Sequence, residues 1–185
     1  MKSKLLASAF VIATTALISF GQDGDNLQYK LLATTRTGTM QKEITETAEQ
    51  GYRILVGSPT SGTEMALFLS REGTAKDPFQ YKLLATTRTG TMQKEMNEAA
   101  DNGFRLIPST MIAKKQMMGG VEIVMILERL PKPTTNFEYK LLATTRTGTL
   151  QKEVTEAKAA GFIIVGMVSR DEHMVVMERE IALKK

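Results

Sequence analysis

The sequence YKLLATTRTGTMQKE, residues 29–43, occurs three times in the chain and determines how the rest is organised. It returns unchanged at residues 81–95 and, with leucine in place of methionine at Leu150, at residues 139–153. We call this sequence the repeated block. Repetition at intervals of about 50 residues indicates an array of small units, each too small to bury its apolar face alone.

The repeated block predicts a strand followed by a helix. Side chains alternate between the two faces of a strand, and we expect the more apolar face, which carries Tyr29 and Leu31, to be buried. Gly38 is expected to supply backbone freedom at the turn, and Thr39 a side-chain oxygen that caps the helix. Apolar residues at helical spacing follow in every copy, which predicts an amphipathic helix.

Each predicted helix ends at a glycine followed by an aromatic residue, in the pairs Gly51-Tyr52, Gly103-Phe104 and Gly161-Phe162. A glycine in this place adopts the left-handed conformation, and the next side chain folds back onto the helix. Two further strands are expected in each unit, at residues 53–58 and 64–71, 105–111 and 121–128, and 163–168 and 173–178.

The pattern predicts an α+β protein of three tandem βαββ repeats, with antiparallel sheets and one helix on a face of each sheet. In the last strand of the second unit, Val121, Ile123, Met125 and Leu127 can meet the helix, whereas Val124 and Ile126 need a second partner on the other face. We therefore expect the sheets to pack against each other with pseudo-threefold symmetry. The alternative is a linear array that dimerises.

These units set the expected boundaries. A polar N-terminal lead at residues 22–28 precedes the first repeat. The repeats occupy residues 29–71, 79–129 and 137–185, the last with the C-terminal tail. Polar linkers that contain proline, at residues 72–78 and 130–136, join them.

Residues 1–21 have the pattern of a secretory signal peptide. A positive start, MKSK, precedes an apolar run of 16 residues, and Ser19 and Gly21 stand three and one residues before the expected cleavage. The alternative is a retained membrane anchor, but the run is shorter than the roughly 20 residues of a typical span. We therefore expect an exported protein, periplasmic or extracellular, with no stable membrane span after cleavage.

Charge is concentrated in the repeated block. Without Lys2 and Lys4 the chain has 22 basic and 20 acidic residues, an excess too small to indicate a nucleic-acid partner. Each block nevertheless carries three basic residues against one acidic residue. The positive charge therefore belongs to the repeated part of the chain.

An anionic small molecule is the ligand that this chemistry favours. An arginine at a strand end, followed by Thr-Gly-Thr at a helix start, would combine a guanidinium with free N–H groups and a partial positive charge. The candidate ligand-binding residues are Lys30, Thr34, Arg36, Thr37, Gly38 and Thr39, then Lys82, Thr86, Arg88, Thr89, Gly90 and Thr91, then Lys140, Thr144, Arg146, Thr147, Gly148 and Thr149. The pattern lacks the glycine spacing of a nucleotide-binding loop.

The identity of the copies has two explanations. Packing requires matching size and polarity rather than identical residues, so retention of Lys30, Thr34, Arg36 and Thr37 in every copy indicates either recent exchange between the copies or a use for their surface chemistry. Sequence alone leaves both open.

Catalytic and metal-binding patterns are scarce. The chain has one histidine, His173, and no cysteine. No nucleophile, base and orienting group can be assembled. We therefore expect no enzymatic activity, no catalytic residue, no metal and no cofactor.

A basic hairpin, residues 113–120, is found in the second unit alone. It contains Lys114, Lys115, Met117 and Met118. We expect a mobile surface loop, with contact to a partner or a membrane surface as the alternative.

Two resemblances follow from these motifs. Tyr-Lys opening a strand, Gln-Lys-Glu in the first turn of a helix, then glycine, an aromatic residue and a hairpin resemble a family of small bacterial domains of unknown function whose members read YK, helix, GW; here Tyr52, Phe104 and Phe162 stand at the Trp position. The βαββ order is also similar to dodecin, a flavin-storing protein, but the chain has no tryptophan to stack on a flavin. The second resemblance implies topology alone, and neither implies catalytic residues.

The sequence thus favours an exported, non-enzymatic binding or scaffold protein with anionic ligands at the Arg-Thr-Gly-Thr turns. The alternative is a purely structural or envelope-associated protein-interaction module, whose repeats build a surface and bind no small ligand. The expected partner is an anionic small molecule or an envelope protein.

Overall fold

The computed structural model describes residues 26–73, 78–129 and 132–182. The predicted signal peptide, residues 1–21, lies outside the described residues, as do residues 22–25 of the lead, 74–77 and 130–131 of the linkers, and 183–185 of the tail.

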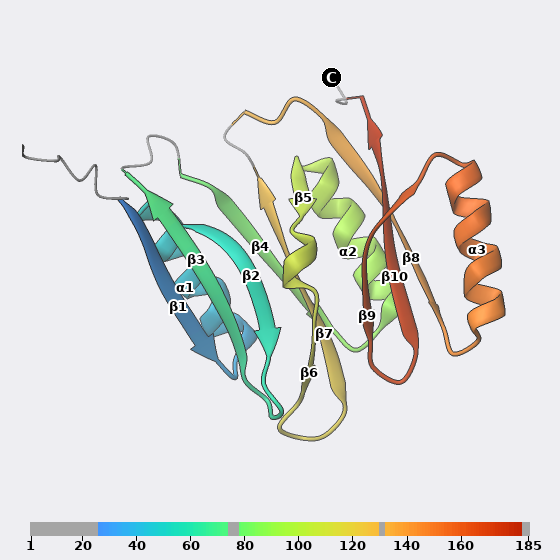
Figure 1. The fold of residues 1–185 in the computed structure, drawn as a ribbon, viewed down its shortest axis with the longest axis horizontal. Coiled ribbons are helices and arrows are strands. Elements are labelled where there is room, and N and C mark those ends of the chain that lie inside the picture. Colours follow the sequence, from blue (N-terminus) through green and yellow to red (C-terminus); the bar gives the residue numbers. More distant parts are fainter. Residues whose placement is uncertain (1–25, 74–77, 130–131, 183–185) are drawn as a thin grey trace, which may run out of the picture.

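Three βαββ units follow one another along the chain (Figure 1). Unit 1 comprises β1 (Leu27–Thr34), α1 (Thr37–Glu49), β2 (Arg53–Pro59) and β3 (Met65–Glu72). Unit 2 comprises β4 (Gln80–Thr86), α2 (Thr89–Asp101), β5 (Phe104–Leu106), the 3₁₀ turn η1 (Pro108–Thr110), β6 (Ile112–Lys115) and β7 (Val121–Arg129). Unit 3 comprises β8 (Asn136–Thr144), α3 (Thr147–Ala159), β9 (Ile163–Ser169) and β10 (His173–Ile181). The predicted α+β class with repeated units is confirmed.

Each unit forms an antiparallel sheet with its last strand in the middle and its first strand at an edge. The strand orders are β1-β3-β2, β4-β7-β5 with β6 also paired to β7, and β8-β10-β9. The register between the first and last strands is the same in all units. The tyrosine that opens each block lies opposite the equivalent residue of the last strand, which is Ser70 in unit 1, Glu128 in unit 2 and Glu178 in unit 3. Positions can therefore be compared directly between units.

The helices begin earlier than the threonine pattern predicts. The residue before the first helical turn is Arg36 in unit 1, and no side chain caps that end. The Thr34 hydroxyl instead accepts a hydrogen bond from the Arg36 N–H, 3.2 Å away, which turns the chain directly after the strand. Thr39 therefore lies within the first turn, and its predicted capping role is wrong.

The predicted helix stops are confirmed. Gly51, Gly103 and Gly161 have φ angles of 86°, 80° and 89°, which an L-residue with a side chain rarely adopts. In unit 1 the Tyr52 N–H then donates to the Thr47 carbonyl. This hydrogen bond, typical of a Schellman helix stop, satisfies a carbonyl of the last turn and directs the chain into the next strand.

The second strand of unit 2 is broken where a continuous strand, residues 105–111, was predicted. Pro108 cannot donate a backbone hydrogen bond, and residues 108–110 form a 3₁₀ turn. The Thr110 hydroxyl accepts from the Ile126 N–H at 3.0 Å and so replaces a missing bond of the sheet. The proline thus divides the expected strand into β5 and β6.

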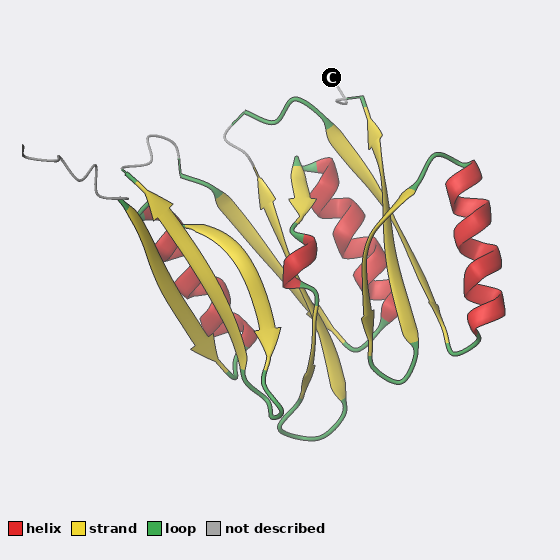
Figure 2. Cartoon of the chain, in the orientation of Figure 1, coloured by secondary structure: helices red, strands yellow, loops and turns green. Residues whose placement is uncertain are grey.

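The units lie in a row (Figure 2), each sheet packing against the unit before it. We call the face of a sheet that carries its own helix the inner face, and the opposite face the outer face. Val124 and Ile126, on the outer face of sheet 2, are buried in one cluster with Met40 and Ile44 of α1. Met174 and Val176 of unit 3 join the cluster around α2 in the same way. The predicted need for a second partner is therefore met by the preceding unit.

The row is open rather than closed. Unit 1 and unit 3 stand at its two ends, with β1 and α3 far apart (Figure 1). The predicted pseudo-threefold arrangement is therefore wrong. Each sheet packs its outer face against the inner side of the preceding unit, so every unit is displaced in the same direction and the row does not close. The expected burial of the tyrosine face fails in unit 1 for the same reason, because no unit precedes it within the described residues.

Buried tyrosines fix the spacing between units. The Tyr81 hydroxyl accepts a hydrogen bond from the Ile54 N–H at 3.1 Å, and the Tyr139 hydroxyl accepts one from the Leu106 N–H at 2.7 Å. Burial raises the pKa of both phenols above the ordinary tyrosine value. Both therefore remain neutral hydrogen-bonding groups between the units.

Tyr139→Phe should lower the free energy of unfolding by about 1–3 kcal/mol, because it leaves the buried Leu106 N–H without an acceptor. Tyr29→Phe is the matched control, since Tyr29 occupies the same place in the repeated block but is exposed; its effect should stay within about 0.5 kcal/mol. Urea denaturation measures both. Equal losses in the two variants would contradict the assignment.

Candidate functional site

The candidate site occurs three times, at the turn from the first strand of each unit into its helix. We call residues 34–39, 86–91 and 144–149 corners 1, 2 and 3. In each corner the threonine hydroxyl bonds the arginine N–H two residues later, at 3.2, 3.1 and 3.1 Å. The first helical bond in corner 1 runs from the Met40 N–H to the Arg36 carbonyl. The N–H groups of Thr37, Gly38 and Thr39 therefore have no partner within the helix.

The corners are electropositive. None of the three helices has an acidic residue in its first turn, so the partial positive charge of the helix N-terminus is not offset there. Arg36, Arg88 and Arg146 are exposed, and within the described residues their guanidinium groups form no ion pair. This chemistry attracts anions.

Glycine at the corners is not needed for the backbone. Gly38, Gly90 and Gly148 are absent from the glycines with positive φ, so the expected role in backbone freedom is not observed. A Cβ added at any of the three would meet nothing within 4 Å. Neither backbone strain nor crowding by neighbouring atoms explains why glycine recurs here. A ligand or other group that approaches the backbone closely would explain it.

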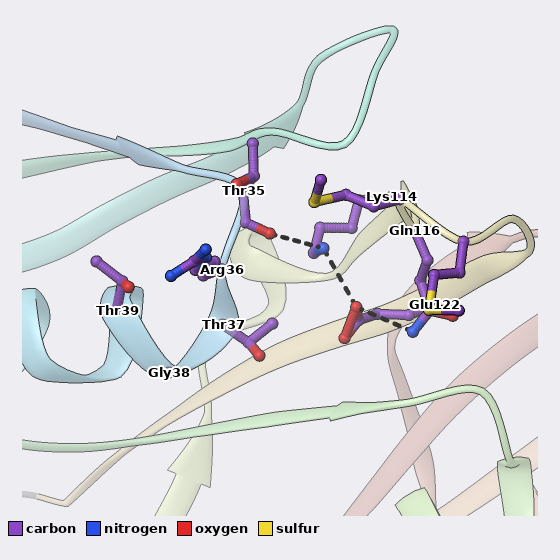
Figure 3. Close-up of a pocket in the computed structure, with 10 residues that line it drawn as sticks. Thr35, Arg36, Thr37, Gly38, Thr39, Lys114, Gln116 and Glu122 are labelled. Atoms are coloured by element: carbon purple, nitrogen blue, oxygen red, sulfur yellow. Dashed lines mark hydrogen bonds and ion pairs between the residues drawn. The ribbon is translucent and has the colours of Figure 1, made fainter.

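Corner 1 borders a cavity of about 520 Å³ that it shares with the hairpin of unit 2 (Figure 3). Lys114 Nζ donates to the Thr35 carbonyl at 3.3 Å and pairs with the Glu122 carboxylate at 3.2 Å. Lys114 is buried, so the basic hairpin predicted as a surface loop is partly anchored in the core. Met117 and Met118, at its tip, are exposed.

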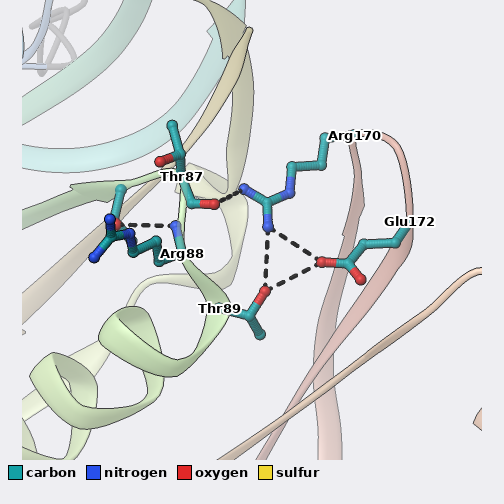
Figure 4. A network of polar contacts seen from close by, with 6 residues as sticks. Thr87, Arg88, Thr89, Arg170 and Glu172 are labelled. Carbon is teal, nitrogen blue, oxygen red and sulfur yellow. Dashed lines mark hydrogen bonds and ion pairs between the residues drawn. The ribbon is translucent and has the colours of Figure 1, made fainter.

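Corner 2 is contacted by the hairpin of unit 3 in a related way (Figure 4). Arg170 donates to the Thr87 carbonyl and to the Thr89 hydroxyl. The Thr89 hydroxyl donates to the Glu172 carboxylate at 3.1 Å, and Glu172 also pairs with Arg170 at 3.1 Å. One candidate ligand residue of corner 2, Thr89, thus already has partners in the next unit, as does the carbonyl of its neighbour Thr87.

A common arrangement emerges at the first two corners. Thr35 and Thr87 are equivalent residues, and each carbonyl accepts from a cation of the following hairpin. No unit follows corner 3 in the part of the chain that the structure describes. The corners are therefore alike in their backbone but differ in what covers them.

The lysines of the candidate set do not reach their own corners. Each precedes its corner arginine by six residues, and a strand rises about 3.3 Å per residue, so the two residues lie roughly 20 Å apart. Lys30 instead donates to the Gln50 side chain at 3.2 Å, at the far end of α1. Lys82 lines a groove of about 450 Å³ with Glu95 and Glu98 of α2, and that groove also touches Thr37 and Gly38.

A glutamine in the block has a role that sequence reasoning missed. Gln41 Nε2 donates to the Tyr81 carbonyl at 3.1 Å, and its Oε1 accepts from the Leu83 N–H at 2.7 Å. Gln93 binds the Tyr139 carbonyl and the Leu141 N–H in the same way. We call each pair of bonds an amide clamp, because a side chain satisfies the free edge of the next unit's first strand.

Ion pairs accompany the amide clamps. Arg53 pairs with Glu128 of unit 2, and Arg105 pairs with Glu178 of unit 3 at 2.6 Å. Arg53 also lies over the Phe79 ring, at 4.8 Å from its centroid, as Arg105 lies over Phe137. Both contacts join one unit to the next. The signal for them was present in the recurring Gly-aromatic-Arg of units 1 and 2.

The single histidine of the chain is not part of a catalytic arrangement among the described residues. His173 Nδ1 lies 3.3 Å from the Ser169 hydroxyl, both on exposed strand ends. Among the described residues no group of three His, Asp or Glu side chains could hold a metal ion. The described helices are too short or too polar to cross a membrane.

No protein-family model matches the chain, and comparisons with curated proteins and with solved structures find no match.

Lys114→Met should lower the free energy of unfolding by about 3–5 kcal/mol, because it leaves the mostly buried Glu122 carboxylate without its cation. The double variant Lys114→Met/Glu122→Leu should recover most of this loss. Lys42→Met is the control, since its pair with Glu46 is exposed, and it should cost less than about 1 kcal/mol. Chemical denaturation tests all three. A double variant as unstable as the single one would disprove the coupling.

Proposed function

We propose that the chain is an exported, non-enzymatic scaffold protein whose three units build one rigid interaction surface. The observation that carries this proposal is the use of the repeated block. Its tyrosine, its glutamine and the carbonyl of its second threonine, Thr35 or Thr87, form the bonds that join each unit to the next. Joining units in register needs the same chemistry each time, which supports a structural reason for the identity of the copies.

A rigid array also suits an envelope-associated role. Interface contacts on both sides of unit 2 combine apolar burial, amide clamps and ion pairs. Elements that share a core of this kind move together rather than as separate domains. The proposed partner is accordingly a protein of the envelope, bound by the array as a whole.

Gln41→Leu should uncouple unit 1 from unit 2, because it leaves the Tyr81 carbonyl and the Leu83 N–H without partners. We expect a loss of about 1–3 kcal/mol. The chain has no tryptophan, so Tyr52→Trp and Phe104→Trp can report on units 1 and 2 separately. Their urea transitions should coincide in the parent chain and separate in the Gln41→Leu background.

Gln151→Leu is the matched control for this experiment, because Gln151 has the same place in the block but bonds within the described residues only to its own helix, at Thr155. It should leave both transitions unchanged in a dilute sample. Reporters that already separate in the parent chain would disprove the rigid scaffold.

Anion binding at the corners is the second candidate. It is supported by three exposed guanidinium groups that form no ion pair among the described residues, by free helix N–H groups, and by a glycine that leaves open space. The ligand would be a small molecule with a phosphate, sulfate or carboxylate group, whose oxygens accept from Arg and backbone donors together. Corner 3 is the most accessible, since Arg146, Thr147, Gly148 and Thr149 are all exposed.

Substituting Arg36, Arg88 and Arg146 together by Gln should abolish anion binding and leave the fold unchanged. The measurement is thermal unfolding with inorganic phosphate, sulfate, nucleotides and sugar phosphates. An anion at 100 times its Kd should add about 2.7 kcal/mol of stability to the parent chain, and none to the triple variant. An equal shift in both would place binding elsewhere, and no shift with any anion would leave the scaffold proposal alone.

A further inference from the structure

We propose that copies of this chain associate head to tail, the outer face of unit 1 in one copy docking on α3 and the inner face of unit 3 in the next. This inference deepens the scaffold proposal and rests on it, because it names a second copy as a partner. The contact would repeat the interface that the chain already forms twice, between units 1 and 2 and between units 2 and 3.

The head of the array exposes what the interior buries. Tyr29 is 63% exposed, whereas its counterparts Tyr81 and Tyr139 are 7% and 2% exposed. Phe68 lies opposite Leu31 in the sheet; it is 48% exposed, although the equivalent Ile126 and Val176 are fully buried. Tyr29, Leu31 and Phe68 therefore form an apolar patch in the place where other units receive a preceding neighbour.

The head also leaves a strand edge open. In units 2 and 3 a glutamine from the preceding helix clamps the carbonyl of the tyrosine and the N–H two residues later. The Tyr29 carbonyl and the Leu31 N–H have no side-chain partner within the part of the chain that the structure describes. An uncovered edge of this kind is a template for association.

The tail carries the complementary half. α1 and α2 each bury four residues, but α3 buries one, Ala157. Ile164 of β9 is 55% exposed, whereas its counterparts Ile54 and Leu106 are each 4% exposed. The side chain of Gln151, the third clamp residue, bonds to Thr155 of its own helix and, among the described residues, to no other unit. The clamp glutamine and the apolar residue of β9 are therefore present and uncovered, whereas Lys158 stands where α1 and α2 bury Ala48 and Ala100.

The two ends are also matched in charge. Both internal interfaces have an arginine that pairs with a glutamate across the junction. At the tail, Ile163 stands in the place of the junction arginine. At the head, Ser70 stands in the place of the junction glutamate, and Leu27 in the place of the aromatic residue under the arginine. Both partners of the ion pair are replaced together, so docking would leave no unpaired charge at that place. The Lys158 ammonium would stay in solvent at the rim of the contact, with its aliphatic stem along the apolar surface. An apolar contact from Ile163 to Leu27 would stand in for the ion pair.

One internal contact is missing from the ends. The Thr145 carbonyl is equivalent to those of Thr35 and Thr87, which accept from Lys114 and Arg170. The head hairpin, residues 60–64, contains no lysine or arginine. The contact between copies is therefore weaker than the internal ones, and association depends on concentration. Because the docking surfaces differ, the contact is heterologous and joins copies into chains or rings.

The test uses the protein as purified after export, examined by sedimentation velocity over a wide range of concentrations. The parent chain should shift from one copy to dimers and larger species. Phe68→Lys blocks the head and Ile164→Lys blocks the tail, and each should stay a single copy. Mixed together they should form a one-to-one dimer and nothing larger, because each supplies the surface that the other lacks.

Met118→Lys is the control variant, since Met118 is fully exposed on the hairpin tip and belongs to neither end; it should associate like the parent. Circular dichroism checks each fold, and Leu31→Lys replaces Phe68→Lys if that variant does not fold. A parent chain that stays a single copy at every concentration, or a mixture that forms no dimer, overturns the inference. Coincident unfolding of the tryptophan reporters would then still uphold the rigid scaffold, so the two failures are distinguishable.

Discussion

The fold depends on the burial of each outer sheet face by the unit before it. A βαββ unit of this size has one helix, which covers only one face of its sheet, so the opposite face must find another apolar surface. In unit 2 that face carries Val124 and Ile126, both fully buried against unit 1. The amide clamps and buried tyrosine hydroxyls then fix how the neighbouring sheets are aligned. Apolar burial brings the units together, and polar bonds set their register.

This arrangement changes how the identical copies are understood. The glutamine and tyrosine of the block bind across the junctions between units, where a substitution of similar size would leave a strand edge or a buried N–H without a partner. The arginine and glycine of the corners have no such role within the described residues. The block therefore combines residues that build the array with residues whose chemistry faces outward.

The sequence was sufficient for the local structure and insufficient for the arrangement of units. The alternating strand pattern, the glycine stops at Gly51, Gly103 and Gly161 and the two-faced apolar strand β7 all led to correct predictions, because each depends on neighbours in the chain. The break at Pro108 was missed, since a single proline was outweighed by apolar residues on both sides. The open row and the clamps depend on contacts between residues that lie 40 to 48 positions apart in sequence. From the sequence alone, Gln41 looks like any other exposed helix residue.

Unit 2 differs from its neighbours because it carries both halves of the junction. Glu128 forms an ion pair with the arginine of the unit before it, and Arg105 forms one with the glutamate of the unit after it. Units 1 and 3 each carry one half and end the series with uncharged residues. Among the described units, only unit 2 therefore carries both the glutamate of one junction and the arginine of the next. Gene duplication of that segment alone would lengthen the array by whole units without leaving a buried charge unmatched.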